Sequence, residues 1–143
     1  MKKIVLITLV FFTLFYSCKK KSTNASENPV PSVPVNLTVY PNDPLNFKLQ
    51  AIGGWIYING GINGIILYHK SPQEFIAIER TSSYLPDNPS AKVVVMSDNF
   101  TCRDTISDSR WQIIDGTVTK GPAQWGLRLY GTTFDGKVLK IKK

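Results

Sequence analysis

Cysteine and histidine are scarce in this chain of 143 residues, which contains two cysteines and one histidine. Cys18 lies in an N-terminal signal, so Cys102 has no partner for an internal disulfide. His69 ends an apolar run just before a Lys-Ser-Pro turn, and we expect it to be exposed there. General acid–base catalysis usually relies on histidine, and no nucleophilic triad or phosphate-binding glycine loop is visible. We therefore do not expect an enzyme.

Helical periodicity is nearly absent too. Short apolar runs recur instead, and Gly, Pro, Asn and Asp divide them. Asn63-Gly64, Asp115-Gly116 and Asp135-Gly136 are dipeptides that favour tight hairpin turns. The pattern predicts an all-β domain, either a small β-sandwich or a small barrel. The expected strands cover residues 35–40, 46–52, 55–59, 64–69, 74–80, 92–96, 110–115, 126–132 and 137–142.

Alternation within these segments indicates which side chains form the core. Residues 62–68 are apolar at both parities, which predicts a strand covered on both faces. The expected core consists of Leu37, Val39, Phe47, Leu49, Ile56, Ile58, Ile65, Leu67, Phe75, Ala77, Val93, Val95, Trp111, Ile113, Leu127, Leu129, Leu139 and Ile141.

Dense basic clusters interleaved with exposed aromatic residues are missing as well. The formal net charge is +7, but the basic residues near the C-terminus alternate with apolar ones. This spacing is typical of the solvated face of a sheet, whereas a nucleic-acid footprint is denser. We therefore exclude nucleic acid as a partner.

One long apolar run is present, over residues 4–16, and it follows Lys2 and Lys3. The run is short for a bilayer core of about 30 Å, and Ser17 ends it with a small residue at a cleavage position. With Cys18 directly after Ser17, the segment resembles a bacterial lipoprotein signal. The resemblance implies that Cys18 is acylated and becomes the mature N-terminus, which places the protein in the bacterial cell envelope, lipid-anchored on the periplasmic or outer face. An uncleaved signal anchor is the alternative.

A polar, proline-containing stretch follows the signal. Lys19, Lys20 and Lys21 precede a run rich in Ser, Thr, Asn and Pro. Such a composition predicts a disordered tether. The three lysines are either a solvated charge run or a site of attraction to anionic lipid headgroups, which is worth about 1 kcal/mol for each basic residue. The expected organisation is a signal over 1–17, a tether with lipidated Cys18 over 18–34, and one β domain over 35–143.

Several short motifs within 35–143 share an order and spacing with a known family. They are the strand Phe75–Thr81, Ser109-Arg110-Trp111, Ile114-Asp115-Gly116, Gly121-Pro122-Ala123 and Leu127-Arg128-Leu129-Tyr130. In this frame the domain resembles the Rieske-type [2Fe-2S] family. The resemblance implies a six-stranded base with a smaller inserted subdomain, whose two loops each supply one Cys and one His in C-x-H and C-x2-H patterns. An unrelated β-sandwich with chance Gly-Pro turns is the alternative.

The four cluster-ligand positions implied by this frame carry other residues. Ser82 and Tyr84 occupy the first pair, and Asp104 and Ser107 occupy the second. A Rieske centre needs two thiolates on one iron and two imidazoles on the other. We therefore expect a degenerate member of the family with no cofactor, acting as a membrane-anchored binding or structural module with a protein partner of unknown identity.

Two other functions stay open at this stage. One is an electron-transfer component of the Rieske ferredoxin type, with a weak metal or redox site at Cys102 and Asp104 or with a partner-supplied ligand. The other is an adhesion or glycan-binding module that uses exposed aromatic residues such as Trp125. Four aspartates around the second loop could also provide oxygen ligands for Ca²⁺, although turn and capping roles suit them equally.

Overall fold

The computed structural model describes residues 28–143. The predicted signal and Cys18 lie outside the described residues. Within the described part the chain forms ten strands and one short 3-10 helix. No helix in this part is long and apolar enough to cross a membrane.

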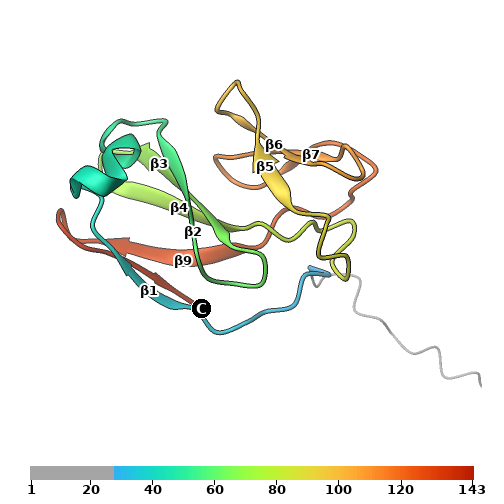
Figure 1. Ribbon diagram of the computed structural model, residues 1–143, viewed down its shortest axis with the longest axis horizontal. Helices are drawn as coiled ribbons and strands as arrows, with labels where there is room; N and C mark the ends of the chain where they lie inside the picture. Colours follow the sequence, from blue (N-terminus) through green and yellow to red (C-terminus); the bar gives the residue numbers. More distant parts are fainter. Residues whose placement is uncertain (1–27) are drawn as a thin grey trace, which may run out of the picture.

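Six strands form the base of the molecule. They are antiparallel neighbours in the order β1-β10-β9-β4-β3-β2, and Figure 1 shows them curling around one side of the structure. Their bounds are β1 Asn36–Val39, β2 Trp55–Ile58, β3 Ile65–Ser71, β4 Glu74–Glu79, β9 Leu129–Phe134 and β10 Leu139–Lys142.

A smaller lobe is inserted between β4 and β9. Its four-stranded antiparallel sheet has the order β5-β6-β7-β8 and lies beside one end of the base (Figure 1). The bounds are β5 Val93–Val95, β6 Thr101–Asp104, β7 Arg110–Gln112 and β8 Val118–Lys120. A six-stranded base with a smaller inserted subdomain confirms the all-β, Rieske-like fold.

Strand β3 separates two hydrophobic cores. Ile65 and Leu67 face the first core, and Ile66 and Tyr68 face the second, so both faces of β3 are buried. The expectation of a strand covered on both faces is therefore confirmed. The first core lies within the base and also contains Leu49, Phe75, Ala77, Tyr130, Leu139 and Ile141. The second joins the base to the lobe and also contains Ile78, Val93, Cys102, Trp111, Ile113, Ala123 and Leu127.

The predicted strand over residues 46–52 is wrong. This segment belongs to the 3-10 helix η2, Pro44–Gln50. Asp43 caps the helix by accepting a hydrogen bond from the Leu45 N–H, and Pro44 fits the first helical position. Leu49 still reaches the first core, but Phe47 is 64% exposed, which corrects its assignment to the core.

Two further differences concern strands. Leu129 of β9 is partly exposed, because the alternation directs its neighbour Tyr130 into the first core. Strands β6 and β8 were not expected at all. Cys102 is the one apolar residue of β6, and Val118 is the one apolar residue of β8, so neither has a readable pattern.

Residues 28–34 differ from the expected tether. Val30 is fully buried although Pro29 and Pro31 on either side of it are exposed. The Arg128 guanidinium donates to the Val30 carbonyl (2.7 Å) and the Asn28 carbonyl (3.1 Å), and Asn28 Nδ2 donates to the Gly126 carbonyl (2.8 Å). One buried apolar side chain and these cross-chain hydrogen bonds fix the segment, so the domain boundary at residue 35 is corrected to include Asn28.

A buried carboxylate stands where the base meets the lobe. Glu79 at the end of β4 accepts five hydrogen bonds, from the N–H of Ile62 (2.8 Å), the N–H of Asn63 (3.0 Å), the N–H and hydroxyl of Thr81 (3.0 and 2.8 Å) and the hydroxyl of Tyr130 (2.6 Å). It therefore fixes the β2–β3 turn, the entry to the lobe and β9 at one point.

These hydrogen bonds determine the protonation of Glu79. Burial by itself raises the pKa, but the hydrogen bonds from Tyr130, Asn63, Ile62 and Thr81 outweigh it and the pKa is lowered overall. Gly61 is required beside the carboxylate: its φ is +63°, and a Cβ there would lie 2.0 Å from Glu79 Oε2.

We expect Glu79→Gln to destabilise the fold by about 2–4 kcal/mol, because the amide NH₂ would face N–H donors. The pKa of Glu79 is lower in the folded than in the unfolded chain. Its contribution is therefore present above the ordinary value of 4.5 and is lost as the pH falls through the folded pKa. Urea unfolding from pH 7 to pH 2.5 should show less acid destabilisation in the variant.

The exposed Glu74→Gln provides the matched control for this substitution. Glu74 pairs with Lys70 at the surface, and such pairs contribute at most about 1 kcal/mol. If both variants lost the same stability with the same pH profile, the role assigned to Glu79 would be wrong.

Candidate functional site

Three of the four positions at which the resemblance places cluster ligands meet in the lobe. Ser82 follows β4 in the first loop, where its N–H donates to the Ala91 carbonyl (3.1 Å). Asp104 ends β6, and Ser107 lies in the turn to β7. Ser82 and Asp104 are fully buried. The sequence frame thus identified positions that are adjacent in space although they lie more than 20 residues apart.

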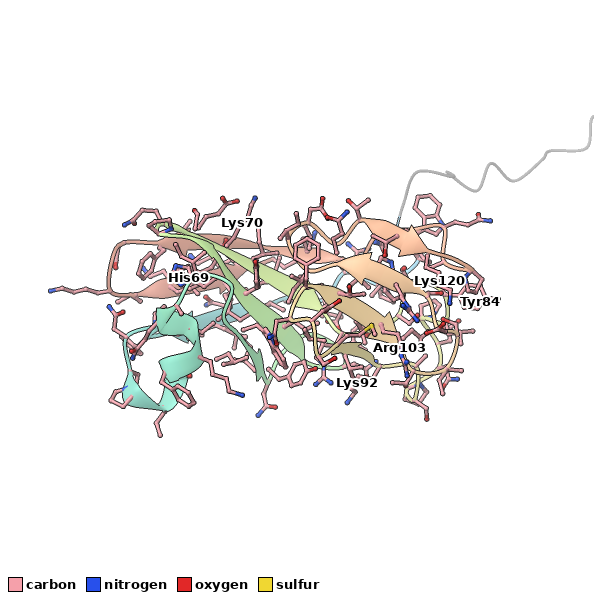
Figure 2. All side chains as sticks on the ribbon, turned by 90° about the horizontal axis from the view of Figure 1, so that it is seen from above. His69, Lys70, Tyr84, Lys92, Arg103 and Lys120 are labelled. Carbon is pink, nitrogen blue, oxygen red and sulfur yellow. The ribbon has the colours of Figure 1, made fainter. Side chains whose placement is uncertain are left out.

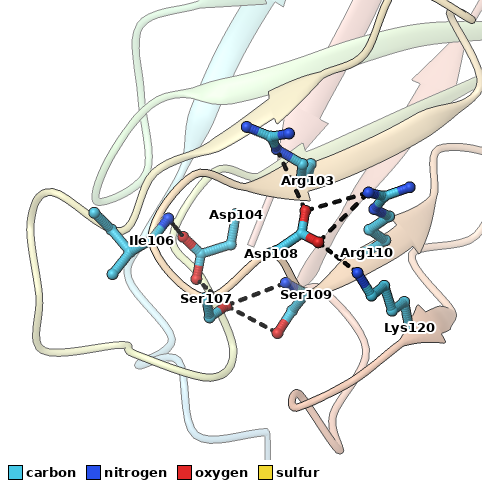
Figure 3. A network of polar contacts seen from close by, with 8 residues as sticks. All are labelled: Arg103, Asp104, Ile106, Ser107, Asp108, Ser109, Arg110 and Lys120. Carbon is cyan, nitrogen blue, oxygen red and sulfur yellow. Dashed lines mark hydrogen bonds and ion pairs between the residues drawn. The ribbon is translucent and has the colours of Figure 1, made fainter.

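The Asp104 carboxylate connects the two loops. Its Oδ2 accepts hydrogen bonds from Ser82 Oγ (2.8 Å) in the first loop and from Ser107 Oγ (2.7 Å) in the second. Its Oδ1 accepts from the Ile106 N–H (2.9 Å) (Figure 3). Hydrogen bonds to an ionised group are roughly twice as strong as neutral ones. We call this set, together with Ser109, the carboxylate–serine network.

The serine hydroxyls extend the network into both loops. Ser107 Oγ lies 2.9 Å from Ser109 Oγ, which accepts a hydrogen bond from the Ala123 N–H (3.0 Å). Ser82 Oγ accepts from the backbone N–H groups of Tyr84 (3.2 Å) and Leu85 (3.4 Å). The Gly121-Pro122-Ala123 segment is therefore fixed to the same point as the first loop.

Local turn chemistry directs the Asp104 carboxylate inward. The Asp108 N–H donates to the Asp104 carbonyl, and the Asp104 N–H donates to the Ser109 carbonyl, both at 3.0 Å, which closes the β6–β7 turn. The bond from the Ile106 N–H to Asp104 Oδ1 is the side-chain turn typical of aspartate. The sequence therefore places a carboxylate and two hydroxyls on the inner side of one tight turn.

Tyr84 is the ligand position that stays outside the network. Its side chain is 45% exposed, and only its backbone N–H contacts Ser82. The ring lines a surface hollow together with Pro29, Pro122 and Trp125. The aromatic residues near the lobe thus flank the network rather than fill the space between the loops.

Cys102 is buried in the second core, on the same side of β6 as Asp104. Burial, with a smaller effect of the Asp98 charge, raises the pKa of its thiol to about 12. A neutral buried thiol is neither a nucleophile nor a good metal ligand. Within residues 28–143, no three His, Cys, Asp or Glu side chains are grouped so that they could hold a metal ion.

The aspartates considered for Ca²⁺ do not converge. Asp98 accepts from the N–H groups of Phe100 and Thr101 and from the Thr101 hydroxyl, and hydrogen bonding to Thr101 lowers the pKa of Asp98. Asp115 accepts from the Thr117 N–H in a separate turn. Each of these carboxylates therefore caps its own loop.

His69 is buried, which corrects the expectation of an exposed turn residue. Its ring stacks on Phe75 with centroids 4.4 Å apart and planes at 10°. The extra length of β3, which continues to Ser71, keeps His69 inside the sheet. Figure 2 shows His69 and Tyr84 at opposite ends of the molecule, so this histidine is remote from the network.

The donor atoms at the site do not fit a [2Fe-2S] cluster. Ser82, Asp104 and Ser107 offer hydroxyl and carboxylate oxygens, whereas the cluster requires thiolates and imidazoles. Their oxygens are already engaged with one another and with backbone N–H groups. The arrangement is suited to fixing the two loops without a metal.

Sequence reasoning missed two parts of the site. Ser109 was counted only as a frame residue, although its Oγ links Ser107 to Ala123. The Asp-x-x-Ser-x-Ser spacing from Asp104 to Ser109 was the available signal. The Trp125 carbonyl, which accepts from Ser83 Oγ (2.6 Å) and from the indole N–H of Trp111 (3.0 Å), had no signal in the sequence.

We expect Asp104→Ala to destabilise the protein by about 2–4 kcal/mol, because two hydroxyls and one backbone N–H lose a charged acceptor in a buried site. Urea unfolding followed by tryptophan fluorescence measures the change. Asp115→Ala is the matched control and should cost no more than about 1 kcal/mol, since Asp115 caps an exposed turn. Equal losses in both variants would contradict the role of the network.

No family model and no curated protein matches the sequence. Among solved structures, the chain is similar to the ferredoxin of carbazole 1,9a-dioxygenase from Nocardioides aromaticivorans IC177, with 15% sequence identity and a TM-score of 0.49. The match covers 77% of this chain and 97% of that one.

Proposed function

We propose that the protein is a lipid-anchored module of the bacterial cell envelope that has lost the iron–sulfur cluster of its fold and serves a binding or structural role. The carboxylate–serine network is the observation that supports this proposal. It occupies three of the four positions at which the resemblance places cluster ligands, and it uses chemistry that cannot hold the cluster.

The carboxylate–serine network also connects the two loops, as a bound cluster would. Coordination by residues of two loops would fix those loops to each other. Here Asp104 joins the first loop, through Ser82, to the second loop, through Ser107. A lobe fixed in this way keeps its shape without a metal, which is what a binding module requires and an electron carrier does not.

The residue inventory supports a function other than catalysis or electron transfer. The buried Cys102 thiol is protonated at neutral pH, and His69 lies in the base, away from the lobe. Neither can serve the network as a ligand or a base. The hollow beside Tyr84 and Trp125 offers exposed aromatic surface for a protein partner.

Iron content tests the proposal. The full-length chain is produced with supplied iron and sulfide, and its visible absorbance and its iron and acid-labile sulfide are measured. We expect colourless protein with no more than trace iron. Two iron atoms per chain with the absorbance of a [2Fe-2S] centre would refute the proposal.

A fourfold variant provides the matched control. Ser82→Cys, Tyr84→His, Asp104→Cys and Ser107→His together restore the donor set that the fold requires. We expect this variant to take up iron and sulfide under the same conditions, which shows that the preparation can report a cluster where the ligands are present.

The lipid anchor is tested separately, by mass spectrometry of the mature N-terminus and by membrane fractionation. We expect the mature chain to begin at Cys18 with attached acyl chains and to sediment with membranes. Cys18→Ala should abolish acylation and processing. A mature chain with an unmodified Cys18, or one cleaved elsewhere, would contradict the anchor while leaving the absence of the cluster open.

A further inference from the structure

Three positively charged side chains stand next to one another across the lobe sheet. Arg103 on β6 pairs in register with Arg110 on β7, and Arg110 pairs with Lys120 on β8. Like charges directly opposite each other on neighbouring strands destabilise a sheet. We call these three residues the basic ladder. Such a row of neighbouring cations favours the binding of an anion wherever the protein's own carboxylates do not neutralise it.

Compensation within the protein is incomplete. Asp108 is the carboxylate that approaches the ladder, at 3.7 Å from Arg103 Nε and 3.3 Å from Arg110 Nη2, and it also accepts a hydrogen bond from Lys120 (Figure 3). That bond, with the charge of Arg110, lowers the pKa of Asp108. Among the described residues, no other carboxylate pairs with the ladder, so three cations share one anion.

The cations remain accessible. The side chains of Arg103, Arg110 and Lys120 are 40%, 35% and 54% exposed. The field of Arg110 also reaches Asp98, but that carboxylate is already engaged with the backbone and hydroxyl of Thr101. The ladder therefore presents a net positive surface with free donors on one face of the lobe. Guanidinium groups with free N–H donors match phosphate oxygens.

The N-terminal segment brings this lobe close to the anchor. Asn28 is fixed to Gly126 and Arg128, near the return from the lobe to β9, and Figure 1 shows the described chain beginning on the lobe side. Ten residue steps separate Cys18 from Asn28, and they span at most about 36 Å. An acylated Cys18 thus holds the lobe, rather than the far end of the base, near the bilayer.

We propose that Arg103, Arg110 and Lys120 bind the anionic phospholipid headgroups of the membrane that holds the anchor. The proposal rests on the lipid anchor of the proposed function. The ladder orients the lobe on the bilayer surface, and Asp108 sets its charge. The attraction is electrostatic and the cations are exposed, so salt screens it. The screening length is about 10 Å at 0.1 M ionic strength.

Energy transfer from tryptophan to a dansyl-labelled lipid tests the proposal. The full-length acylated protein is reconstituted into vesicles of phosphatidylcholine, with or without phosphatidylglycerol. Trp111 and Trp125 in the lobe and Trp55 on β2 act as donors. We expect higher transfer with phosphatidylglycerol and a return to the phosphatidylcholine value in high salt. Equal transfer in the two kinds of vesicle would overturn the proposal.

Matched variants localise the effect. Replacing Arg103, Arg110 and Lys120 by Gln should lower the dependence on phosphatidylglycerol to the part that Lys19, Lys20 and Lys21 contribute. Replacing Lys70, Lys137 and Lys140 of the base by Gln removes the same charge and should leave the dependence unchanged.

Because the triple ladder variant leaves Asp108 unpaired, Asp108→Asn serves as a second test, and it should increase the dependence. Loss of the dependence in the base variant alone would overturn the proposal.

Flotation separates this proposal from the lipid anchor. Anchored protein floats with both kinds of vesicle, so protein that fails to float with phosphatidylcholine lacks the anchor. In that event, flotation with phosphatidylglycerol vesicles that is lower in the triple ladder variant than in the parent chain shows that the ladder binds lipid, because both proteins retain Lys19, Lys20 and Lys21. Binding to soluble polyglutamate without any preference for phosphatidylglycerol would assign the ladder to an acidic protein and overturn the proposal.

Discussion

A single buried carboxylate, that of Asp104, holds the lobe together. It accepts hydrogen bonds from both loops of the lobe, and its own burial is tolerable because both of its oxygens have donors. Without it, the buried Ser82 hydroxyl would lose its acceptor, and the hydrogen-bonded link between the two loops would be broken. The shape of the lobe follows from this satisfied charge, and the surfaces around it depend on that shape.

Glu79 has the corresponding role between the base and the lobe. Glu79 is the last residue of β4 and Asp104 is the last residue of β6, and each carboxylate accepts hydrogen bonds from segments distant in sequence. Glu79 fixes the lobe to the base, and Asp104 fixes the loops within the lobe. The second core, around Trp111, supplies the apolar contact between the two parts. The base therefore fixes the position of the lobe, and Asp104 fixes the loops within the lobe, without a metal.

The sequence predicted what depends on local pattern. Strand β3 was recognisable because its apolar residues occupy both parities. Asp104 and Ser107 were placed by their spacing from Ser109, and Ser82 by its position directly after the strand over 75–81. Strand β6 was not recognisable, because it has one apolar residue and gains its place by pairing with β5 and β7. Asp43 and Pro44 could have indicated the helix that replaced the strand over 46–52. The hydrogen bond from Ser82 to Asp104 could not be predicted from local pattern, since these two residues meet only in the folded chain.

Native-state hydrogen exchange of the metal-free protein tests the central claim most directly. The amides of Ile106 and Asp104 report on the carboxylate–serine network, since one donates to the carboxylate and the other closes the same turn. The account predicts that both exchange slowly in the presence of a chelator, with protection close to that of the β3 amides. Rapid exchange that slows only when iron and sulfide are supplied would contradict it.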